Sequence, residues 1–144
     1  MKTSATPVTT SGIEADPARN AGRGSSVLAT ATGLQHEAAT EGFDWDGTAP
    51  VLAKIEEELA ELREAMTQGP DRVRDEFGDL LFVLVNLARH LRLDPAEALD
   101  QANAKFRRRY QCVLRGRAHW QTLQGADRLQ AMEALWQQAK REER

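Results

Sequence analysis

Four acidic residues between positions 58 and 79 have the types and the spacing of a metal-binding site. Glu58 and Glu61 are three residues apart, and so are Glu76 and Asp79. Residues three apart share one face of an α-helix. The sequence Gln-Gly-Pro at 68–70 lies midway between the pairs and is typical of a turn. If it closes an antiparallel helical hairpin, position 58 faces 79 and position 61 faces 76.

The chemistry that this arrangement allows is the binding of a divalent cation. Carboxylates at close range raise each other's pKa values unless a cation lies among them. Oxygen ligands without a nearby histidine or thiol favour Mg²⁺, or Mn²⁺, over zinc or copper. A bound Mg²⁺ can bridge phosphate oxygens and lower the pKa of a water molecule. A glutamate that the metal does not fully engage, Glu57 or Glu61, then orients or deprotonates that water.

The alternative is that these residues form an ordinary solvated helix face, since glutamate is a good helix former and basic residues lie nearby. The second pair favours the metal site. Asp79 directly precedes the apolar run 80–85, and aspartate is rarely buried without a partner. Gly78 weakens a helix by roughly 1 kcal/mol and suits a place where another group comes close.

A local excess of positive charge lies at 105–109, where the sequence reads KFRRR. The chain as a whole is mildly acidic, with a formal net charge of −3. From the pattern alone, a solvated basic face is an equal alternative to a binding site. Beside a predicted metal site we favour an anion-binding role, because arginine forks and a lysine ammonium suit the oxygens of a polyphosphate.

The elements that must position these residues are helices, because apolar residues recur at spacings of three and four. We expect helices at about 27–41, 49–67, 70–91, 95–115 and 127–142, and therefore an all-α bundle of four to five helices. Residues 1–26 are rich in Ser, Thr, Ala, Gly and Pro. We expect them to be disordered, ahead of one domain at 27–144, because they bury too little to offset their ordering entropy.

The same spacing predicts which side chains are buried. In 49–67 the expected core face is Val51, Leu52, Ile55, Leu59, Leu62 and Met66, with Glu58 and Glu61 alongside it. In 95–115 it is Leu99, Ala102, Phe106, Tyr110 and Val113. In 127–142 it is Leu129, Met132, Leu135, Trp136 and Ala139.

The segment 70–91 is apolar nearly all round, so it needs burial nearly all round. A monomer of four or five short helices does not easily provide that burial, and we predict a homodimer with this segment near the interface. Asn86 is the polar residue inside the run, and it either pairs across the interface or contacts a ligand. We expect His90 to be a surface or capping residue.

Composition excludes several classes of protein. The chain has 144 residues, of which 41% are hydrophobic and 28% charged, and it contains no run of eighteen apolar residues that would predict a membrane span. Its mild acidity argues against direct nucleic-acid binding. The single cysteine, Cys112, excludes an intrachain disulfide and fits a reducing, cytoplasmic location. Its place in a helical pattern favours a packing role over a nucleophilic one.

From about Phe43 to its end, the chain resembles the MazG family of nucleoside triphosphate pyrophosphohydrolases, specifically the second, catalytic domain of two-domain bacterial members. The matching stretches are GFDW at 42–45, KIEEELAEL at 54–62, DEFGDLLFVLVNLARHL at 75–91, NAKFRRR at 103–109 and MEALWQQAKR at 132–141. The resemblance does not extend to the first of the two tandem domains of those bacterial members. It therefore implies no regulatory role of the kind tied to that first domain.

The resemblance implies an all-α NTP pyrophosphatase fold that dimerises and cleaves an NTP between its α- and β-phosphates, giving NMP and pyrophosphate. It implies four Mg²⁺ ligands, Glu58, Glu61, Glu76 and Asp79. It implies phosphate contacts from Lys54, Lys105, Arg108 and Arg109. Trp136, a core residue by pattern alone, falls where the family has a nucleotide-contacting tryptophan.

Two other functions compete with this one. The first is a non-catalytic helical dimerisation or regulatory module on the same scaffold; the retained carboxylates argue against it, since a decayed enzyme would be free to lose them. The second is a narrower relative, such as a dCTP/dUTP pyrophosphatase or a phosphoribosyl-ATP pyrophosphatase. Assays with a panel of nucleotides separate the three.

Overall fold

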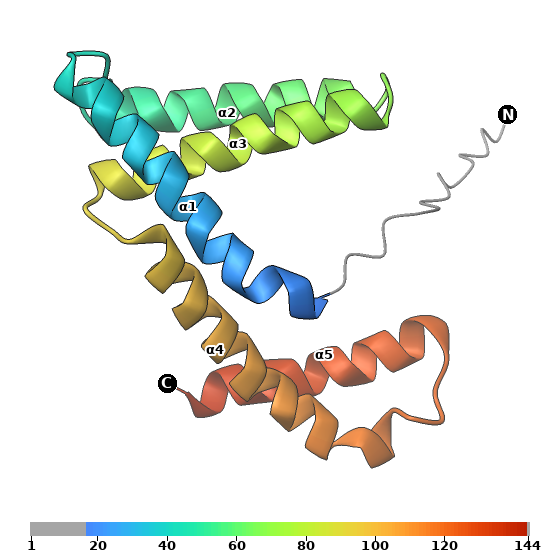
Figure 1. Ribbon diagram of the computed structural model, residues 1–144. Coiled ribbons are helices and arrows are strands. Elements are labelled where there is room, and N and C mark those ends of the chain that lie inside the picture. The colour runs from blue at the N-terminus through green and yellow to red at the C-terminus, as the bar shows by residue number, and fades with distance from the viewer. Residues whose placement is uncertain (1–16, 144) are drawn as a thin grey trace, which may run out of the picture. The chain divides into compact units, whose positions relative to one another are not determined.

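The computed structural model describes residues 17–143, with side chains from residue 27 onward. The helices are α1 (Pro17–Thr40), α2 (Thr48–Ala65), α3 (Pro70–His90), α4 (Pro95–Arg115) and α5 (Gly125–Glu142), with a short 3₁₀ helix, η1, at Arg117–His119 (Figure 1). The prediction of an all-α fold is confirmed. The chain divides into two compact units, one ending at Asn86 and one beginning at Leu87.

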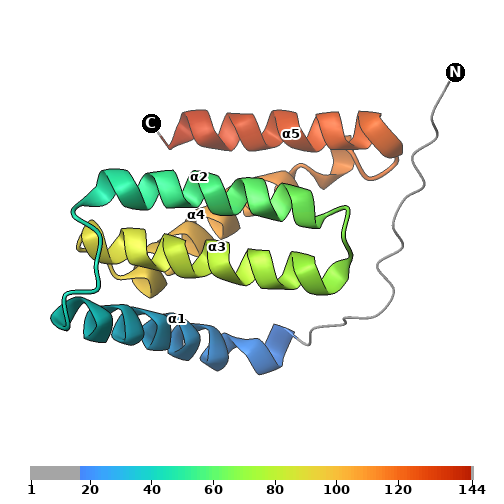
Figure 2. The same ribbon diagram turned by 90° about the horizontal axis from the view of Figure 1, so that it is seen from above.

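In the first unit, α2 and α3 form the expected antiparallel hairpin and lie side by side in both views (Figures 1 and 2). The turn depends on Gly69, whose φ of 121° lies in a region that favours glycine. Pro70 follows as the first residue of α3, where its missing N–H is no loss. The turn therefore sets α3 running back along α2.

The buried face of α2 differs from the expected one. Val51 and Leu62 are buried as predicted, but Leu52, Leu59 and Met66 are exposed, and burying them was a wrong prediction. Two rows of residues run along this helix at alternating spacings of three and four. One passes through 51, 55, 58, 62 and 65 and is apolar except for Glu58; the other passes through 52, 55, 59, 62 and 66 and is apolar throughout. The helix buries the first row, so Glu58 lies within the buried face of α2 instead of beside it.

Helix α1 is longer than expected. It begins at Pro17, so residues 17–26 are helical although we predicted them to be disordered; residues 1–16 lie outside the described part of the chain. Proline suits the first position of a helix, and alanine and arginine, frequent in 18–23, are good helix formers. The buried Gln35 donates a hydrogen bond from Nε2 to the Phe82 carbonyl at 2.7 Å, which joins α1 to α3.

In the second unit, α4 and α5 are joined through η1 and the turn after it (Figure 1). Asp94 caps α4 as expected, because its side chain accepts hydrogen bonds from the backbone of Ala96 and Glu97. Trp120 is buried, and its indole donates to the Val113 carbonyl at 2.9 Å. The cap fixes the start of α4, and the Trp120 hydrogen bond ties the α4–α5 connection back to the end of α4.

The core of this second unit is smaller than predicted. Of the expected α4 face, Val113 is buried, but Leu99, Ala102, Phe106 and Tyr110 are exposed; on α5, Ala139 is buried and Leu129 is exposed. The apolar stripe on α4 is longer than the surface that α5 and η1 cover within this unit. At Gly116 the two helices come so close that an added Cβ would lie 2.5 Å from Leu135 Cδ1.

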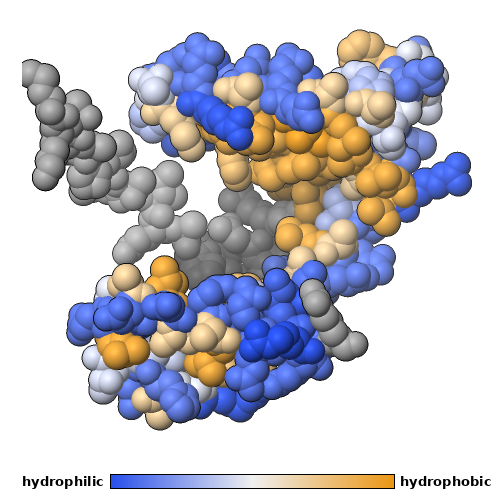
Figure 3. Space-filling model, turned by 180° about the vertical axis from the view of Figure 1, so that it is seen from behind, coloured by the Kyte–Doolittle hydropathy of each residue, from blue (hydrophilic) through white to orange (hydrophobic). Residues whose placement is uncertain are grey.

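Helix α3 keeps much of its apolar surface exposed. Leu80 and Leu87 are partly covered and Val83 and Val85 are buried. The exposed apolar residues of the α2–α3 hairpin are Leu52, Leu59, Met66, Phe77, Leu81, Phe82 and Leu84. Figure 3 shows hydrophobic side chains gathered over this part of the surface. None of the described helices has an apolar stretch of the length that crossing a membrane requires.

Candidate metal and phosphate site

Three of the four predicted metal ligands come together between α2 and α3. One carboxylate oxygen from each of Glu58, Glu61 and Glu76 lies within 4.8 Å of the others. Glu58 and Glu76 are buried, at 5% and 6% exposure, whereas Glu61 is exposed. The spacing of the two acidic pairs about the turn therefore predicted a real cluster, with an open side at Glu61.

The second oxygen of Glu58 is an independent sign that this cluster could hold a cation. Glu58 Oε2 is buried and has no hydrogen-bond partner among the described residues. A buried, charged oxygen without a partner is costly, and the cost disappears if a cation binds it. Because all donors in the cluster are carboxylate oxygens, the residues fit a hard divalent cation such as Mg²⁺.

Two basic residues partly neutralise the cluster. Lys54 Nζ lies 2.8 Å from a carboxylate oxygen of Glu58 and 2.8 Å from one of Glu57. Its hydrogen bond with Glu57, and then its contact with Glu58, raise the pKa of Lys54 above its ordinary value. On α3, Arg72 forms an ion pair with Glu76 through one guanidinium nitrogen. Sequence reasoning missed Arg72, although its position four residues before Glu76 on one helix is a recognisable ion-pair signal.

The environment of Glu61 disfavours its charged form. Partial desolvation, and then the negative charges of Glu58 and Glu76, raise the pKa of Glu61, and the charge of Lys54 opposes them. The rise is the expected response of a carboxyl group that shares a small space with two others. A divalent cation would reverse it by favouring the carboxylate.

The remaining predicted residues of this site lie at its edge. Asp79 is exposed, and the three-residue group that the described side chains form does not include it. Glu57 is exposed and is held by Lys54. Asp79 lies three residues after Glu76 and hence on the same side of α3. Its role as fourth ligand therefore stays a prediction.

The predicted phosphate-binding residues of α4 lie in the second unit, on the side that faces α5. Glu143 accepts hydrogen bonds from Arg109 Nε at 2.8 Å and from Arg108 Nε at 3.3 Å. Lys105 is exposed. Arg109 and Trp136 are also near each other, with the guanidinium carbon 5.9 Å from the centre of the indole. A carboxylate thus already occupies the two arginines that we predicted to bind an anion.

Trp136 has the packing role that the pattern indicated, and its contact with a nucleotide stays a prediction. It is partly buried and packs against Phe106, with ring centres 5.2 Å apart. Phe106 in turn stacks on Tyr110 at 5.7 Å. The indole is therefore held in place by aromatic packing, as the pattern indicated, and still has an exposed part.

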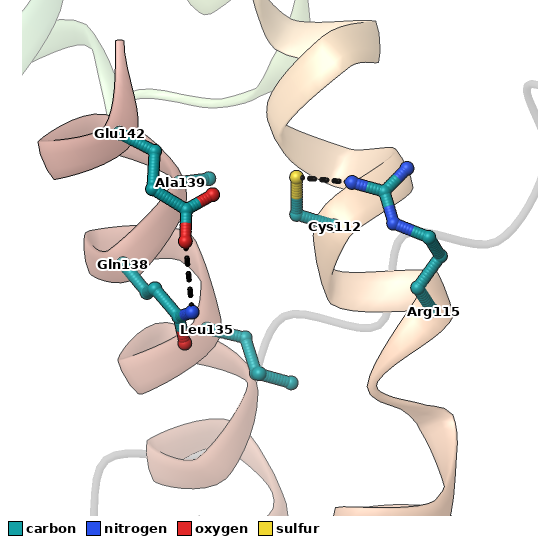
Figure 4. Close-up of a pocket in the computed structure, with 6 residues that line it drawn as sticks. All are labelled: Cys112, Arg115, Leu135, Gln138, Ala139 and Glu142. Atoms are coloured by element: carbon teal, nitrogen blue, oxygen red, sulfur yellow. Dashed lines mark hydrogen bonds between the residues drawn. The ribbon is translucent and has the colours of Figure 1, made fainter. Parts of the chain in front are cut away.

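A separate pocket of about 250 Å³ lies between α4 and α5 (Figure 4). Its polar groups are engaged with one another, since Arg115 donates to Cys112 Sγ at 2.8 Å and Gln138 donates to Glu142 at 2.9 Å. It contains neither the carboxylate cluster nor Lys105. We therefore place the candidate site at the carboxylates and not in this pocket.

Comparison with known families shows which domain the segment around this hairpin resembles. Residues 48–114 match the family model described as the MazG nucleotide pyrophosphohydrolase domain, and this match contains the entire carboxylate cluster. Residues 48–114 are a MazG domain. The resemblance drawn from the acidic pairs and their surrounding stretches is thereby confirmed.

Curated proteins extend the match beyond the MazG domain. A nucleoside triphosphate pyrophosphohydrolase of Escherichia coli strain K12 is 42% identical over 122 residues, which is 81% of this chain and 46% of that protein. The nucleoside triphosphate pyrophosphohydrolase/pyrophosphatase MazG of Thermotoga maritima is 48% identical over 84 residues, 58% of this chain and 32% of that protein. The chain thus spans less than half the length of these relatives.

Proposed function

We propose that this chain is a Mg²⁺-dependent nucleoside triphosphate pyrophosphohydrolase, which converts a (d)NTP to (d)NMP and pyrophosphate. The observation that carries the proposal is the buried oxygen of Glu58, without a partner, in an all-carboxylate cluster inside a MazG domain. The names of the two relatives support the same reaction. Control of the nucleotide pool or removal of unwanted nucleotides would be its purpose.

The metal ligands in this proposal are Glu58, Glu61 and Glu76, with Asp79 as the fourth. When bound there, Mg²⁺ (or Mn²⁺) would neutralise charge on the phosphate oxygens and lower the pKa of a water molecule. Glu58 and Glu76 are buried and would fix the position of the ion, whereas Glu61 is exposed and would lie on the side from which substrate and water arrive.

Water is the nucleophile in this reaction, and no covalent intermediate with the protein is needed. It attacks the α-phosphorus, the bond to the bridging oxygen breaks, and pyrophosphate leaves with that oxygen. Of the two candidate bases, Glu61 is favoured over Glu57, because Glu61 lies in the carboxylate cluster on its exposed side and Glu57 is engaged with Lys54.

Basic residues are proposed to hold the phosphate chain. Lys54 contacts Glu58, so it is adjacent to the phosphates that a cation in the cluster would bind. Lys105, Arg108 and Arg109 provide further positive charge, and phosphate oxygens would replace Glu143 on the two arginines. Trp136 offers its exposed part to the nucleotide, with Phe106 behind it.

We further propose that the chain acts as a homodimer through the exposed apolar surface of α2 and α3. On α3 this surface includes Phe77, Leu81 and Leu84, which recur at spacings of four and three, a typical helix-packing seam. Large exposed apolar patches mark interaction sites. Asn86 is buried within the chain, which disfavours a role for it at the surface of the interface. A cytoplasmic location fits the single cysteine.

The reaction class is tested by product analysis across a panel of canonical and damaged (d)NTPs, with and without Mg²⁺. The proposal predicts equimolar NMP and pyrophosphate, only with the metal present. Release of inorganic phosphate would contradict it. Activity confined to dCTP and dUTP, or to phosphoribosyl-ATP, would establish a narrower relative, and inactivity towards every nucleotide would favour the non-catalytic module.

A further inference from the structure

Each of the two buried carboxylates has a basic residue four positions before it on the same helix. Lys54 precedes Glu58 on α2, and Arg72 precedes Glu76 on α3. Glu58 and Glu76 would otherwise be buried anions, and a buried anion without a counter-charge destabilises the folded chain. The two helices thus carry the same arrangement, one on each side of the cluster.

Each of these basic residues also contacts a second carboxylate, three positions after itself, that is open to solvent. Arg72 Nη1 lies 3.2 Å from Asp75, whose side chain is 66% exposed, whereas the side chain of Glu76 is 8% exposed. Lys54 is shared in the same way between Glu57, which is exposed, and Glu58, which is buried. A basic side chain placed in this way keeps an ion pair even if it releases the buried partner.

We propose that Arg72 is an internal counter-ion of the metal site, paired with both Glu76 and Asp75 when no cation is bound and with Asp75 alone when one is. The inference rests on the proposed function, because it takes Glu76 as a metal ligand. A divalent cation and a guanidinium compete for the same carboxylate oxygens. Because Arg72 keeps its ion pair with Asp75 when Glu76 releases it, the exchange costs little free energy. Arg72 therefore stabilises the metal-free chain and weakens cation binding.

Arg72 and not Lys54 provides the clean test, because Lys54 is also a proposed phosphate contact. Arg74 is a matched control: it lies on the same helix, has the same charge and pairs with the exposed Asp71 at 3.0 Å. In a Mn²⁺ titration of the full chain, followed by the electron paramagnetic resonance signal of free Mn²⁺, Arg72→Gln should tighten binding about fivefold, which corresponds to roughly 1 kcal/mol. Arg74→Gln should change it much less.

Asp75 provides a second, independent variant. Asp75→Asn removes the alternative partner of Arg72, so it should weaken Mn²⁺ binding more than the control Asp71→Asn does. That excess should disappear in the Arg72→Gln background, because the effect acts through Arg72. A double-variant cycle measures this coupling directly.

Thermal unfolding adds a readout that does not depend on catalysis. Without metal, Arg72→Gln should lower the Tm more than Arg74→Gln does. Added Mn²⁺ should then raise the Tm of Arg72→Gln more than it raises the Tm of Arg74→Gln. If the unaltered chain binds no Mn²⁺, the metal site itself is wrong and the counter-ion with it. If it binds Mn²⁺ but Arg72→Gln binds no tighter than Arg74→Gln, the metal site stands and the counter-ion is wrong.

Discussion

Gly78 lies in α3 between the metal-ligand candidates Glu76 and Asp79, and a Cβ added there would have no neighbouring atom within 4 Å in the described chain. Gly78→Ala should therefore stabilise the chain by about 0.5–1 kcal/mol through helix propensity and the unfolded-state entropy. Urea unfolding measures this directly. Gly33→Ala in α1 is the matched control, since a Cβ there also meets nothing. A loss of stability at Gly78 alone would mean that another group packs against it.

At the same scale, spacing predicted that three of the four carboxylates come together, but it did not predict the basic residues around them. The two acidic pairs about the turn at 68–70 were enough to bring Glu58, Glu61 and Glu76 together. The counter-ion role of Arg72 was missed because ion pairs four residues apart are common on solvated helices and carry little information by themselves. Its meaning depends on the burial of Glu76, which appears only in the folded chain.

At the scale of elements, helix positions followed from the sequence more closely than helix faces did. The start of α4 at Pro95 follows directly from its Asp-Pro cap. On α2, the row through 52, 55, 59, 62 and 66 is apolar throughout, so the periodicity favoured it. The helix instead buries the row that contains Glu58, because that row packs against its neighbours, and the pattern of one helix does not encode that packing. The exposed stripe of α4 was predicted to be buried for the same reason.

The end of α5 is held to α4 by an ion pair that depends on pH. Hydrogen bonding from Arg109 lowers the pKa of Glu143 below its ordinary value. A carboxyl group whose pKa is lower in the folded state adds stability above its unfolded pKa and loses it as the pH falls through the folded pKa. Glu143→Gln should thus lower the Tm at pH 7, and the difference from the unaltered chain should vanish in acid.

The matching experiment is thermal unfolding from pH 7 down to about pH 3, in the range where carboxyl groups titrate. Arg109→Gln should show a pH dependence of the same sign, and the double variant should lose little beyond either single variant. A Tm difference that stays constant with pH would show that Glu143 acts through packing and not through charge.

At the scale of the whole molecule, the exposed seam on α3 predicts a dimer that single charges disrupt. Leu81 is 46% exposed on this seam, and Leu99 on α4 is 54% exposed outside it. Leu81→Asp should weaken self-association at least about 30-fold, as expected for a central interface residue worth roughly 2 kcal/mol or more. Leu99→Asp should change it little. Sedimentation equilibrium measures both, and an unchanged dissociation constant for Leu81→Asp would contradict the predicted interface.

The assignment of the carboxylate cluster as the metal site is tested most directly by measuring Mg²⁺-dependent pyrophosphate release from NTPs. Two isosteric variants at neighbouring positions are compared. Glu58→Gln removes the charge of the buried oxygen that has no partner, and Glu56→Gln removes a charge on the exposed side of the same helix. We predict that Glu58→Gln loses at least about 100-fold in rate with helicity retained, and that Glu56→Gln stays near the unaltered rate. Equal rates for the two variants would contradict the assignment of the cluster as the metal site.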